Sequence, residues 1–398
     1  MRVNYGQTVH GKKEIDAVVS VLKTSTQMGS KTRSFEKKIS NLFDKKYGLM
    51  VNSGSSALLL ALSSIDIPKG SNIITPVLTF STTVSSIIQN GYIPNFVDSK
   101  HQTFCIDEEK IEKSINKNTK CILIPNLLGN IPDWKIINKI SKKYKLIVIE
   151  DSADALGSKI DNKSTGKFTD ISITSFYGSH IINCAGNGGM VCFNNKKYYE
   201  KAKLLRSWGR SSSLYDEKSE KIENRFNVKV DGITYDKKFI FSEIGYNFEP
   251  SEIGAAFGLV QLDKLSENTK KRSNNYIKHS NFFKKFNNFF EIPVQLPRVK
   301  TGWLAYPITI KNNSFFNRTD LQIYLEKKNI QTRVCFTGNI LKQPGFKNIK
   351  CVKKNDYPNA NNVMKNTLLI ACHHGLSSKQ IEYMHKNIKL FLKQKIKN

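Results

Sequence analysis

Short β-branched runs alternate with amphipathic segments through the first half of the chain, and this alternation constrains the fold more than any other feature. The runs have the residue types of strands, and the segments between them have helical periodicity. Strands this apolar, separated by helices, predict an α/β fold with a mostly parallel sheet covered by helices on both faces. The expected strands are residues 47–54, 72–77, 92–98, 120–127, 145–151, 171–177 and 188–194, and the expected helices are 12–23, 55–65, 79–90, 132–144 and 198–208.

The second half of the chain has a different organisation. A long periodic stretch at 251–286 leads into shorter candidate elements at 303–310, 319–330 and 331–336, and an amphipathic helix is expected at 377–394. We therefore expect a large unit over residues 1–250, with an N-terminal arm, and a small α+β unit over residues 251–398. Residues 210–240 are polar and weakly patterned, which predicts a surface excursion.

Composition narrows the class of protein. The 398 residues are 39% hydrophobic and 24% charged, which is typical of a folded globular protein. The formal net charge is +29, but the lysines are spread along the chain without a dense basic tract, which favours a solvated surface over a nucleic-acid interface. No run of 18 apolar residues and no leader-like start occur, so we expect a cytoplasmic protein without a membrane span. The seven cysteines include no CxxC pair, and no metal site is predicted.

One turn between a strand and a helix has the features of an anion site. Gly54, Ser55 and Ser56 follow the strand at 47–54 and open the next helix, so free backbone N–H groups would face outward at its positive end. A simple helix N-cap explains the same residues equally well. The GxGxxG and GxxxxGK[ST] loops are absent, which argues against NAD or ATP as the phosphate ligand.

Polar groups follow two further strands. Asp151 ends the apolar strand 145–151, and Asp154 follows three residues later. The carboxyl end of a parallel strand is where ligands bind in α/β sheets, although a turn or capping role for Asp151 is the plain alternative. Ser175 and His180 lie between the strands 171–177 and 188–194. A single loop histidine is more often structural than catalytic.

Six motifs, in order, resemble one family. VNSGSSALLLAL, TPVLTFSTT, EDSADALGS, SFYGSHIINCAGNGGMV, GYNFEPSEIGAAFGLVQL and TRVCFTGNILKQ are similar to motifs of the sugar-nucleotide aminotransferases, which are fold-type I pyridoxal-phosphate (PLP) enzymes. In most of that family a lysine that holds the cofactor stands where this chain has His180. Histidine there resembles the branch of 3-dehydratases that use pyridoxamine phosphate (PMP). The resemblance implies a large domain with a mostly parallel seven-stranded sheet and a small C-terminal α+β domain.

The resemblance also implies roles for individual residues. Asp151 would contact the pyridine nitrogen and keep it protonated, with Asp154 near the ring hydroxyl. Phe80 would stack on the ring, although an ordinary core aromatic is nearly as good an interpretation. The remaining roles would be phosphate binding by Gly54, Ser55, Ser56 and Ser175, and by Asn247 of the partner subunit in a homodimer. Arg333 either binds the diphosphate or the glutamate carboxylate, or is an exposed residue at a strand end.

The implied activity is removal of the C3 hydroxyl from a nucleotide-linked 4-keto-6-deoxyhexose, with L-glutamate restoring the cofactor's amine. Imidazole forms no stable imine with an aldehyde, so His180 would act as a general base. Cluster-bearing members of the branch carry a cysteine-rich run after SWGR, whereas this chain has no cysteine between Cys192 and Cys335, so no [2Fe–2S] cluster is expected. Two alternatives to a dehydratase remain: an aminotransferase that uses another lysine, and a non-catalytic binding protein. His373 and His374 lie either near the mouth of the active site or, as the favoured prediction has it, at the surface as a pair, and no role is assigned to them.

Overall fold

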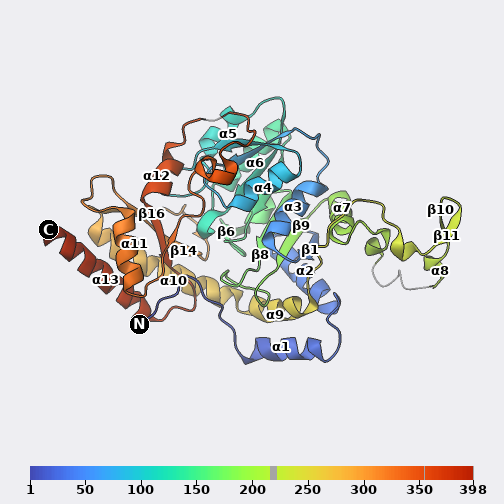
Figure 1. Cartoon of the computed structure of the whole chain (residues 1–398), viewed down its shortest axis with the longest axis horizontal. Helices are drawn as coiled ribbons and strands as arrows, with labels where there is room; N and C mark the ends of the chain where they lie inside the picture. The colour runs from blue at the N-terminus through green and yellow to red at the C-terminus, as the bar shows by residue number, and fades with distance from the viewer. Residues whose placement is uncertain (216–221, 354, 398) are drawn as a thin grey trace.

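A seven-stranded sheet forms the centre of the computed structural model, which describes residues 1–215, 222–353 and 355–397 (Figure 1). The strand order is β1-β9-β8-β5-β4-β2-β3, and β9 runs antiparallel to both of its neighbours while the other pairs are parallel. The predicted mostly parallel sheet is therefore confirmed. Its strands are β1 (Tyr47–Val51), β2 (Asn72–Pro76), β3 (Ile93–Val97), β4 (Thr119–Pro125), β5 (Ile147–Asp151), β8 (Ile171–Ser175) and β9 (Gly189–Phe193).

Helices cover both faces of this sheet. Along β4, Cys121 and Leu123 point into one apolar cluster, whereas Ile122 and Ile124 point into another. This alternation follows from the two-residue period of a strand, and it explains why the strand is apolar throughout. The first cluster lies under α3 (Gly54–Ser64), α4 (Ser81–Gln89) and α7 (Lys196–Arg206), and the second lies under α5 (Glu108–Ser114) and α6 (Trp134–Tyr144).

One helix of the N-terminal half was not predicted. α2 (Ser30–Leu42) packs in the third part of the core against α9 (Glu252–Asp263), on which α1 (Lys12–Leu22) also packs. Its N-cap, Gly29, has no side chain to cap the helix. The carboxylate of Glu252 supplies the cap instead, because it accepts hydrogen bonds from the N–H groups of Gly29 (2.8 Å) and Lys31 (2.6 Å).

The C-terminal part is built on a four-stranded antiparallel sheet, β12-β14-β16-β15. Its elements are β12 (Phe290–Glu291), β14 (Ala305–Ile310), β15 (Arg333–Val334), β16 (Thr367–Ala371), α10 (Leu265–Phe283), α11 (Arg318–Lys327), α12 (Pro358–Asn366) and α13 (Ser378–Lys397). The periodic stretch 251–286 thus forms α9 and α10, as its pattern indicates. The division of the chain at residue 250 stays a prediction.

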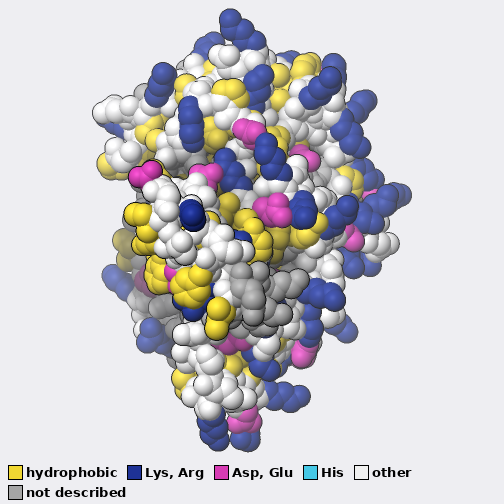
Figure 2. Space-filling view, turned by 90° about the vertical axis from the view of Figure 1, so that its right-hand side faces the viewer, with side chains coloured by type: hydrophobic (Ala, Val, Ile, Leu, Met, Phe, Trp, Pro, Cys, Tyr) yellow, Lys and Arg dark blue, Asp and Glu magenta, His cyan; other side chains and the backbone are white. Residues whose placement is uncertain are grey.

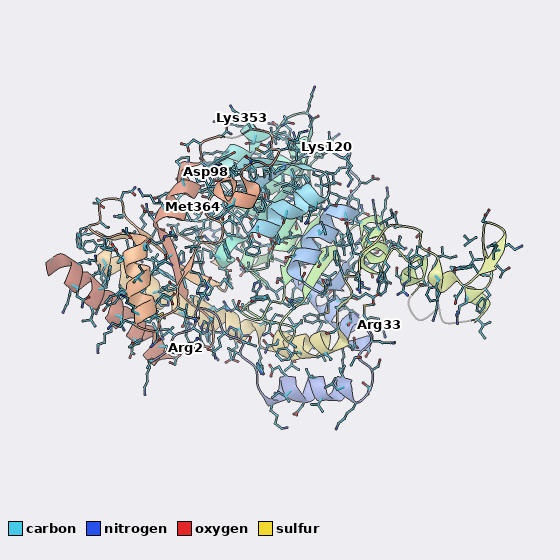
Figure 3. The ribbon with its side chains drawn as sticks, in the orientation of Figure 1. Arg2, Arg33, Asp98, Lys120, Lys353 and Met364 are labelled. Atoms are coloured by element: carbon cyan, nitrogen blue, oxygen red, sulfur yellow. The ribbon has the colours of Figure 1, made fainter. Side chains whose placement is uncertain are left out.

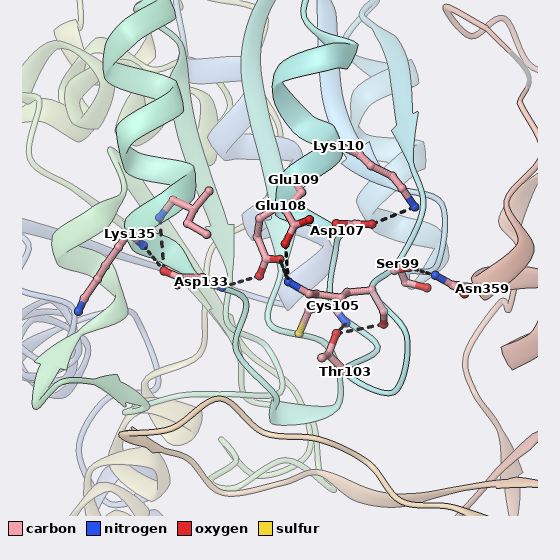
Figure 4. Close-up of polar contacts among 12 residues, drawn as sticks. Ser99, Thr103, Cys105, Asp107, Glu108, Glu109, Lys110, Asp133, Lys135 and Asn359 are labelled. Atoms are coloured by element: carbon pink, nitrogen blue, oxygen red, sulfur yellow. Dashed lines mark hydrogen bonds and ion pairs between the residues drawn. The ribbon is translucent and has the colours of Figure 1, made fainter.

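The two parts are joined by short strands and by a helix cap. β13 (Val299–Lys300) pairs with β6 (Lys159–Ile160), which pairs with β7 (Lys163–Ser164). At the far end of the sheet, the carboxylate of Asp98 accepts hydrogen bonds from the N–H groups of Asn359 and Ala360, 3.0 Å each, and so caps α12 (Figure 3). The side chain of Asn359 also donates to the carbonyl of Ser99 at 2.8 Å, and Glu108 accepts from the N–H of Asp133 nearby (Figure 4).

An arm projects from the body beyond α7 (Figure 1). It carries α8 (Ile222–Arg225) and the hairpin of β10 (Val228–Val230) and β11 (Ile233–Tyr235). The described part of the segment 210–240 therefore lies at the surface, as predicted, and residues 216–221 fall outside the described residues. Figure 2 views the molecule from this side and shows many Lys and Arg side chains around a few hydrophobic ones. Within the described ranges, no helix is long and apolar enough to cross a membrane.

Candidate active site

A cavity of about 360 Å³ opens at the carboxyl ends of the parallel strands. Residues from the C-terminal part, Leu304 and Phe336, and Tyr5 from the N-terminal segment complete its wall. The structure brings together seven of the ten predicted site residues on this wall: Gly54, Ser55, Phe80, Asp151, Asp154, Ser175 and His180. Residues far apart in the sequence therefore meet where an α/β sheet places its ligand.

The start of α3 forms one end of the cavity. Ser53 caps the helix by accepting the N–H of Ser56 at 3.1 Å. A Cβ on Gly54 would lie 2.6 Å from the Cβ of Ser175, so only glycine lets the helix start this close to the end of β8. The first-turn N–H groups and the hydroxyls of Ser55 and Ser175 thus lie together at the positive end of a helix, which suits a phosphate. Ser56 itself is directed elsewhere, because its Oγ donates to Asn52 at 2.6 Å.

Two carboxyl groups, buried Asp151 and part-buried Asp154, lie at the end of β5. Asp151 accepts the N–H of Ala153 at 3.0 Å, and Asp154 accepts that of Leu128 at 3.0 Å. Burial, together with the charge of Glu150, raises the pKa of Asp151 to about 6. Burial and the negative charge of Asp151 raise the pKa of Asp154 to about 7. A cationic group in the cavity, such as a protonated ring nitrogen, would stabilise the ionised form of both carboxyl groups and so lower their pKa values.

His180 lies in the loop between β8 and β9, where its main-chain N–H donates to the carbonyl of Tyr177 at 3.0 Å. Within the part of the chain that is described, its buried Nδ1 has no hydrogen-bond partner of normal geometry. Burial, and then the positive charge of Arg272, lower the pKa of the imidazole to about 4, against the opposing effect of backbone groups of Ala153 and Ser175. His180 is therefore neutral near pH 7, which is the state that accepts a proton.

An aromatic wall faces these polar groups. Phe80 precedes α4 and remains 50% exposed, with its ring 5.9 Å from that of Phe336 in an edge-on arrangement. A large apolar ring left open beside a cavity has room for a flat ligand against its face. The structure therefore does not support the core-aromatic interpretation of Phe80.

Two other predicted site residues lie away from the cavity wall. Arg333 is exposed on β15, and its guanidinium lies 5.4 Å from the ring of Tyr5, which itself lines the cavity. Asn247 is exposed and pairs through its backbone with Ser207. The expectation that Asn247 reaches the site of a partner subunit stays a prediction.

The predicted surface pair of histidines is wrong. His373 and His374 are both buried, with 1% and 8% of their surface exposed. His373 contacts the carbonyl of Asn4 through Nε2 at 3.1 Å, and Nδ1 of His374 accepts the N–H of Nε of Arg272 at 3.2 Å. Both lie just after β16, beside the N-terminal segment that His373 contacts, and a polar dipeptide gives no sequence signal of that burial.

Sequence reasoning also missed functional neighbours of His180. Tyr5, Tyr177 and Asn126 line the cavity, and Arg272 contacts the loop that carries His180. Tyr5 belongs to a polar N-terminal segment with no pattern, and Arg272 lies in a helix rich in lysine and asparagine. Nothing local distinguishes Tyr5 and Arg272, since only the tertiary fold brings them to the cavity, whereas Asn126 follows β4 and Tyr177 lies in the loop of His180.

The fold is an α/β fold of the PLP-dependent aminotransferase type, and its cavity combines a helix start, an aromatic wall and two carboxyl groups. A model of the DegT/DnrJ/EryC1/StrS aminotransferase family matches residues 9–389, and the chain belongs to this family.

Comparison with known proteins finds relatives of two activities. The chain is 32% identical to the lipopolysaccharide biosynthesis protein RfbH of Salmonella typhimurium over 94% of this chain and 88% of that protein. It is 31% identical to GDP-4-keto-6-deoxy-D-mannose 3-dehydratase of Escherichia coli over 94% and 96%. The solved structure of the E. coli dehydratase with bound hydrated PLP matches with a TM-score of 0.86, 29% identity and coverage of 97% and 100%. The aminotransferase PseC of Helicobacter pylori, involved in pseudaminic acid biosynthesis, matches equally well, with a TM-score of 0.86, 26% identity and coverage of 99% and 100%.

Proposed function

We propose that this chain is a PMP/PLP-dependent 3-dehydratase that removes the C3 hydroxyl of a nucleotide-linked 4-keto-6-deoxyhexose in deoxysugar biosynthesis. One observation carries the proposal: neutral His180 faces the cavity, and no lysine is among the residues that line it in the described part of the chain. Imidazole can move a proton but cannot tether an aldehyde cofactor stably. The activity printed for the E. coli dehydratase supports the same reaction class.

Different residues of the cavity bind the phosphate, the ring and the ring nitrogen of the cofactor. The start of α3 at Gly54 and Ser55, together with Ser175, holds the cofactor phosphate, and Phe80 covers the ring. Asp151 holds the proton of the pyridine nitrogen, which keeps the ring electron-withdrawing. When bound, the cofactor supplies the amine that attacks the C4 ketone and the ring that accepts the released electrons.

His180 supplies the proton transfer. A ring nitrogen of the neutral imidazole accepts the proton whose removal drives the loss of the C3 hydroxyl, and the imidazolium returns a proton to the departing oxygen, which leaves as water. Such a role contributes about 10²–10⁴-fold to rate. Hydrolysis then releases ammonia and a 3-deoxy-4-keto sugar, and L-glutamate restores the amine. This route needs no electron relay, so the proposal includes no [2Fe–2S] cluster. It includes a homodimer in which Asn247 of each subunit approaches the other site.

Incubation of the purified protein with PMP, L-glutamate and a panel of GDP-, CDP-, dTDP- and UDP-linked 4-keto-6-deoxysugars tests the proposal. We expect ammonia release and a product lighter by one oxygen atom with at least one sugar. His180→Asn should lower that rate roughly 10²–10⁴-fold. His101→Asn, the same change at an exposed histidine, should leave it unchanged.

A sugar aminotransferase is the second candidate, and the equal structural match to the H. pylori aminotransferase favours it. In that case another lysine must hold the cofactor. Borohydride reduction with PLP, followed by peptide mapping, would then yield a pyridoxyl-lysine, and the sugar product would gain an amino group without ammonia release. That pair of results would replace the dehydratase proposal.

A further inference from the structure

A buried cation lies behind the loop that carries His180. Arg272 of α10 has 0% of its surface exposed, and its guanidinium donates to the carbonyls of Trp303, Leu304 and Ser179, 3.1 Å each. Among the residues that the structure describes, no carboxylate lies within 4.0 Å of this guanidinium. A buried charge held by three carbonyls and the neutral imidazole of His374, with Asp154 acting on it only through space, is costly, so this site gains something that a neutral side chain would not provide.

Asn268 acts on the same loop from the same helix. It precedes Arg272 by four residues, so the two side chains share one face of α10. Asn268 donates through Nδ2 to the carbonyl of Ile181 at 3.0 Å, and Arg272 donates to that of Ser179. These two carbonyls belong to the residues on either side of His180. One helix face therefore fixes the backbone before and after the imidazole.

The charge of Arg272 also acts on the imidazole. Burial is the larger cause of the low pKa of His180, and the positive charge of Arg272 is the second. The pKa of Arg272 is itself lowered to about 10 by burial, so the guanidinium is charged at neutral pH. The other titratable groups on the wall of the same cavity are Asp151, Asp154, Tyr177 and Tyr5.

Arg272 further connects the imidazole to the C-terminal part. Leu304, whose carbonyl accepts from the guanidinium, also lines the cavity. Nε of Arg272 donates to Nδ1 of His374, and this hydrogen bond fixes the position of Nε. His374 adds no second positive charge, because burial and the charge of Arg272 lower its pKa to about 3. All four hydrogen bonds thus set the guanidinium in one orientation toward the loop.

We propose that Arg272 and Asn268 are positioning residues that hold His180 in the geometry required for proton transfer. The proposal rests on the proposed function only in giving His180 that task, and the arrangement itself can be measured without it.

Three variants separate position from charge. Arg272→Lys keeps the charge but loses the planar set of guanidinium donors, and Asn268→Ala removes only the hydrogen bond to Ile181. Arg272→Met removes both the donors and the charge. The first readout is NMR titration of the His180 imidazole in the cofactor-free protein. The second is the single-turnover rate at which L-glutamate converts bound PLP to PMP.

We expect the Lys and Ala variants to slow the glutamate reaction roughly 10²-fold while the pKa of His180 stays at its native value, because a small misplacement has a cost of this size. In Arg272→Met the pKa of His180 should also rise by about one pH unit, as expected when a like charge is removed. Arg206→Met is the matched control, since Arg206 is equally buried but donates to Glu36 and the carbonyl of Met50. It should lower thermal stability without moving the His180 titration.

Native His180 titration in Arg272→Met, with rates that only follow stability as in the control, would overturn the proposal. If the Met variant does not fold, native glutamate rates in both Arg272→Lys and Asn268→Ala would overturn it. Slower glutamate reactions in Arg272→Lys and Asn268→Ala, in a protein that dehydrates none of the sugars, would support the positioning role while rejecting the proposed dehydration, so the two failures are distinguishable.

Discussion

Asp151→Asn should make the cofactor-free protein more stable while weakening its binding of the cofactor. Burial raises the pKa of this carboxyl from 3.8 to about 6. Between these values the unfolded chain loses its proton first, so the free energy of unfolding falls as pH rises from 3.8 through 6. A shift of about two pH units at about 1.4 kcal/mol each makes the ionised carboxylate cost about 3 kcal/mol above pH 6. Asparagine removes this cost and keeps an oxygen for the N–H of Ala153.

Binding should change in the opposite direction. Asparagine leaves a protonated pyridine ring without its buried counter-charge, which costs about 3–5 kcal/mol. That loss corresponds to a roughly 10²–10⁴-fold weaker Kd. No lysine lines the cavity in the described part of the chain, so equilibrium dialysis with PMP reads the affinity directly.

Urea unfolding at pH 5 and pH 8 provides the stability measurement. The gain from Asp151→Asn should be complete at pH 8 and about half as large at pH 5. Asp98→Asn is the matched control, because Asp98 is also buried but caps α12. It should lower stability and leave PMP binding intact. A less stable Asp151→Asn protein at pH 8, or an unchanged Kd, would refute the reasoning.

Two further outcomes follow from the structure. His279 and His385 contact each other at 3.0 Å, and burial lowers their pKa values to about 3 and about 4. The contribution of this pair to stability should therefore be complete above pH 6.5 and fall as the pH drops below it. Replacement of both histidines by leucine should flatten the pH dependence of the urea midpoint between pH 7 and pH 5, and an equally steep profile would contradict this. Gly54→Ala should weaken PMP binding at least tenfold, because the new Cβ would meet Ser175 at 2.6 Å. Gly11→Ala, with nothing within 4 Å, should bind PMP normally, and equal affinities in the two variants would show that the start of α3 does not hold the phosphate.

The sheet was predictable because its signal is local. Each of the seven strands is a short apolar run followed by a helix-like or turn-rich segment, and all seven were expected near their observed bounds. α2 was not, because residues 30–42 are strongly polar and the cap of the helix is Glu252, more than 200 residues away. Propensity and periodicity cannot register a cap that only the folded chain supplies.

The cavity was predictable where its residues follow strands. Asp151, Ser175 and the start of α3 lie at strand ends, which topology alone places together. The burial of His373 and His374 was not, because their partners come from Asn4 and Arg272. These contacts depend on how the N-terminal segment and α10 pack, which a single sequence does not reveal.

The hydrogen bonds that fix the loop at His180 reach only main-chain oxygens, those of residues 179 and 181. Every amino acid has such an oxygen, so the scaffold imposes no preference on the side chain between them. Under the proposed function, exchange of lysine for histidine at this point therefore redirects the chemistry in one evolutionary step with little penalty for folding. A family that contains both amino-group transfer and water elimination is the expected outcome of that tolerance.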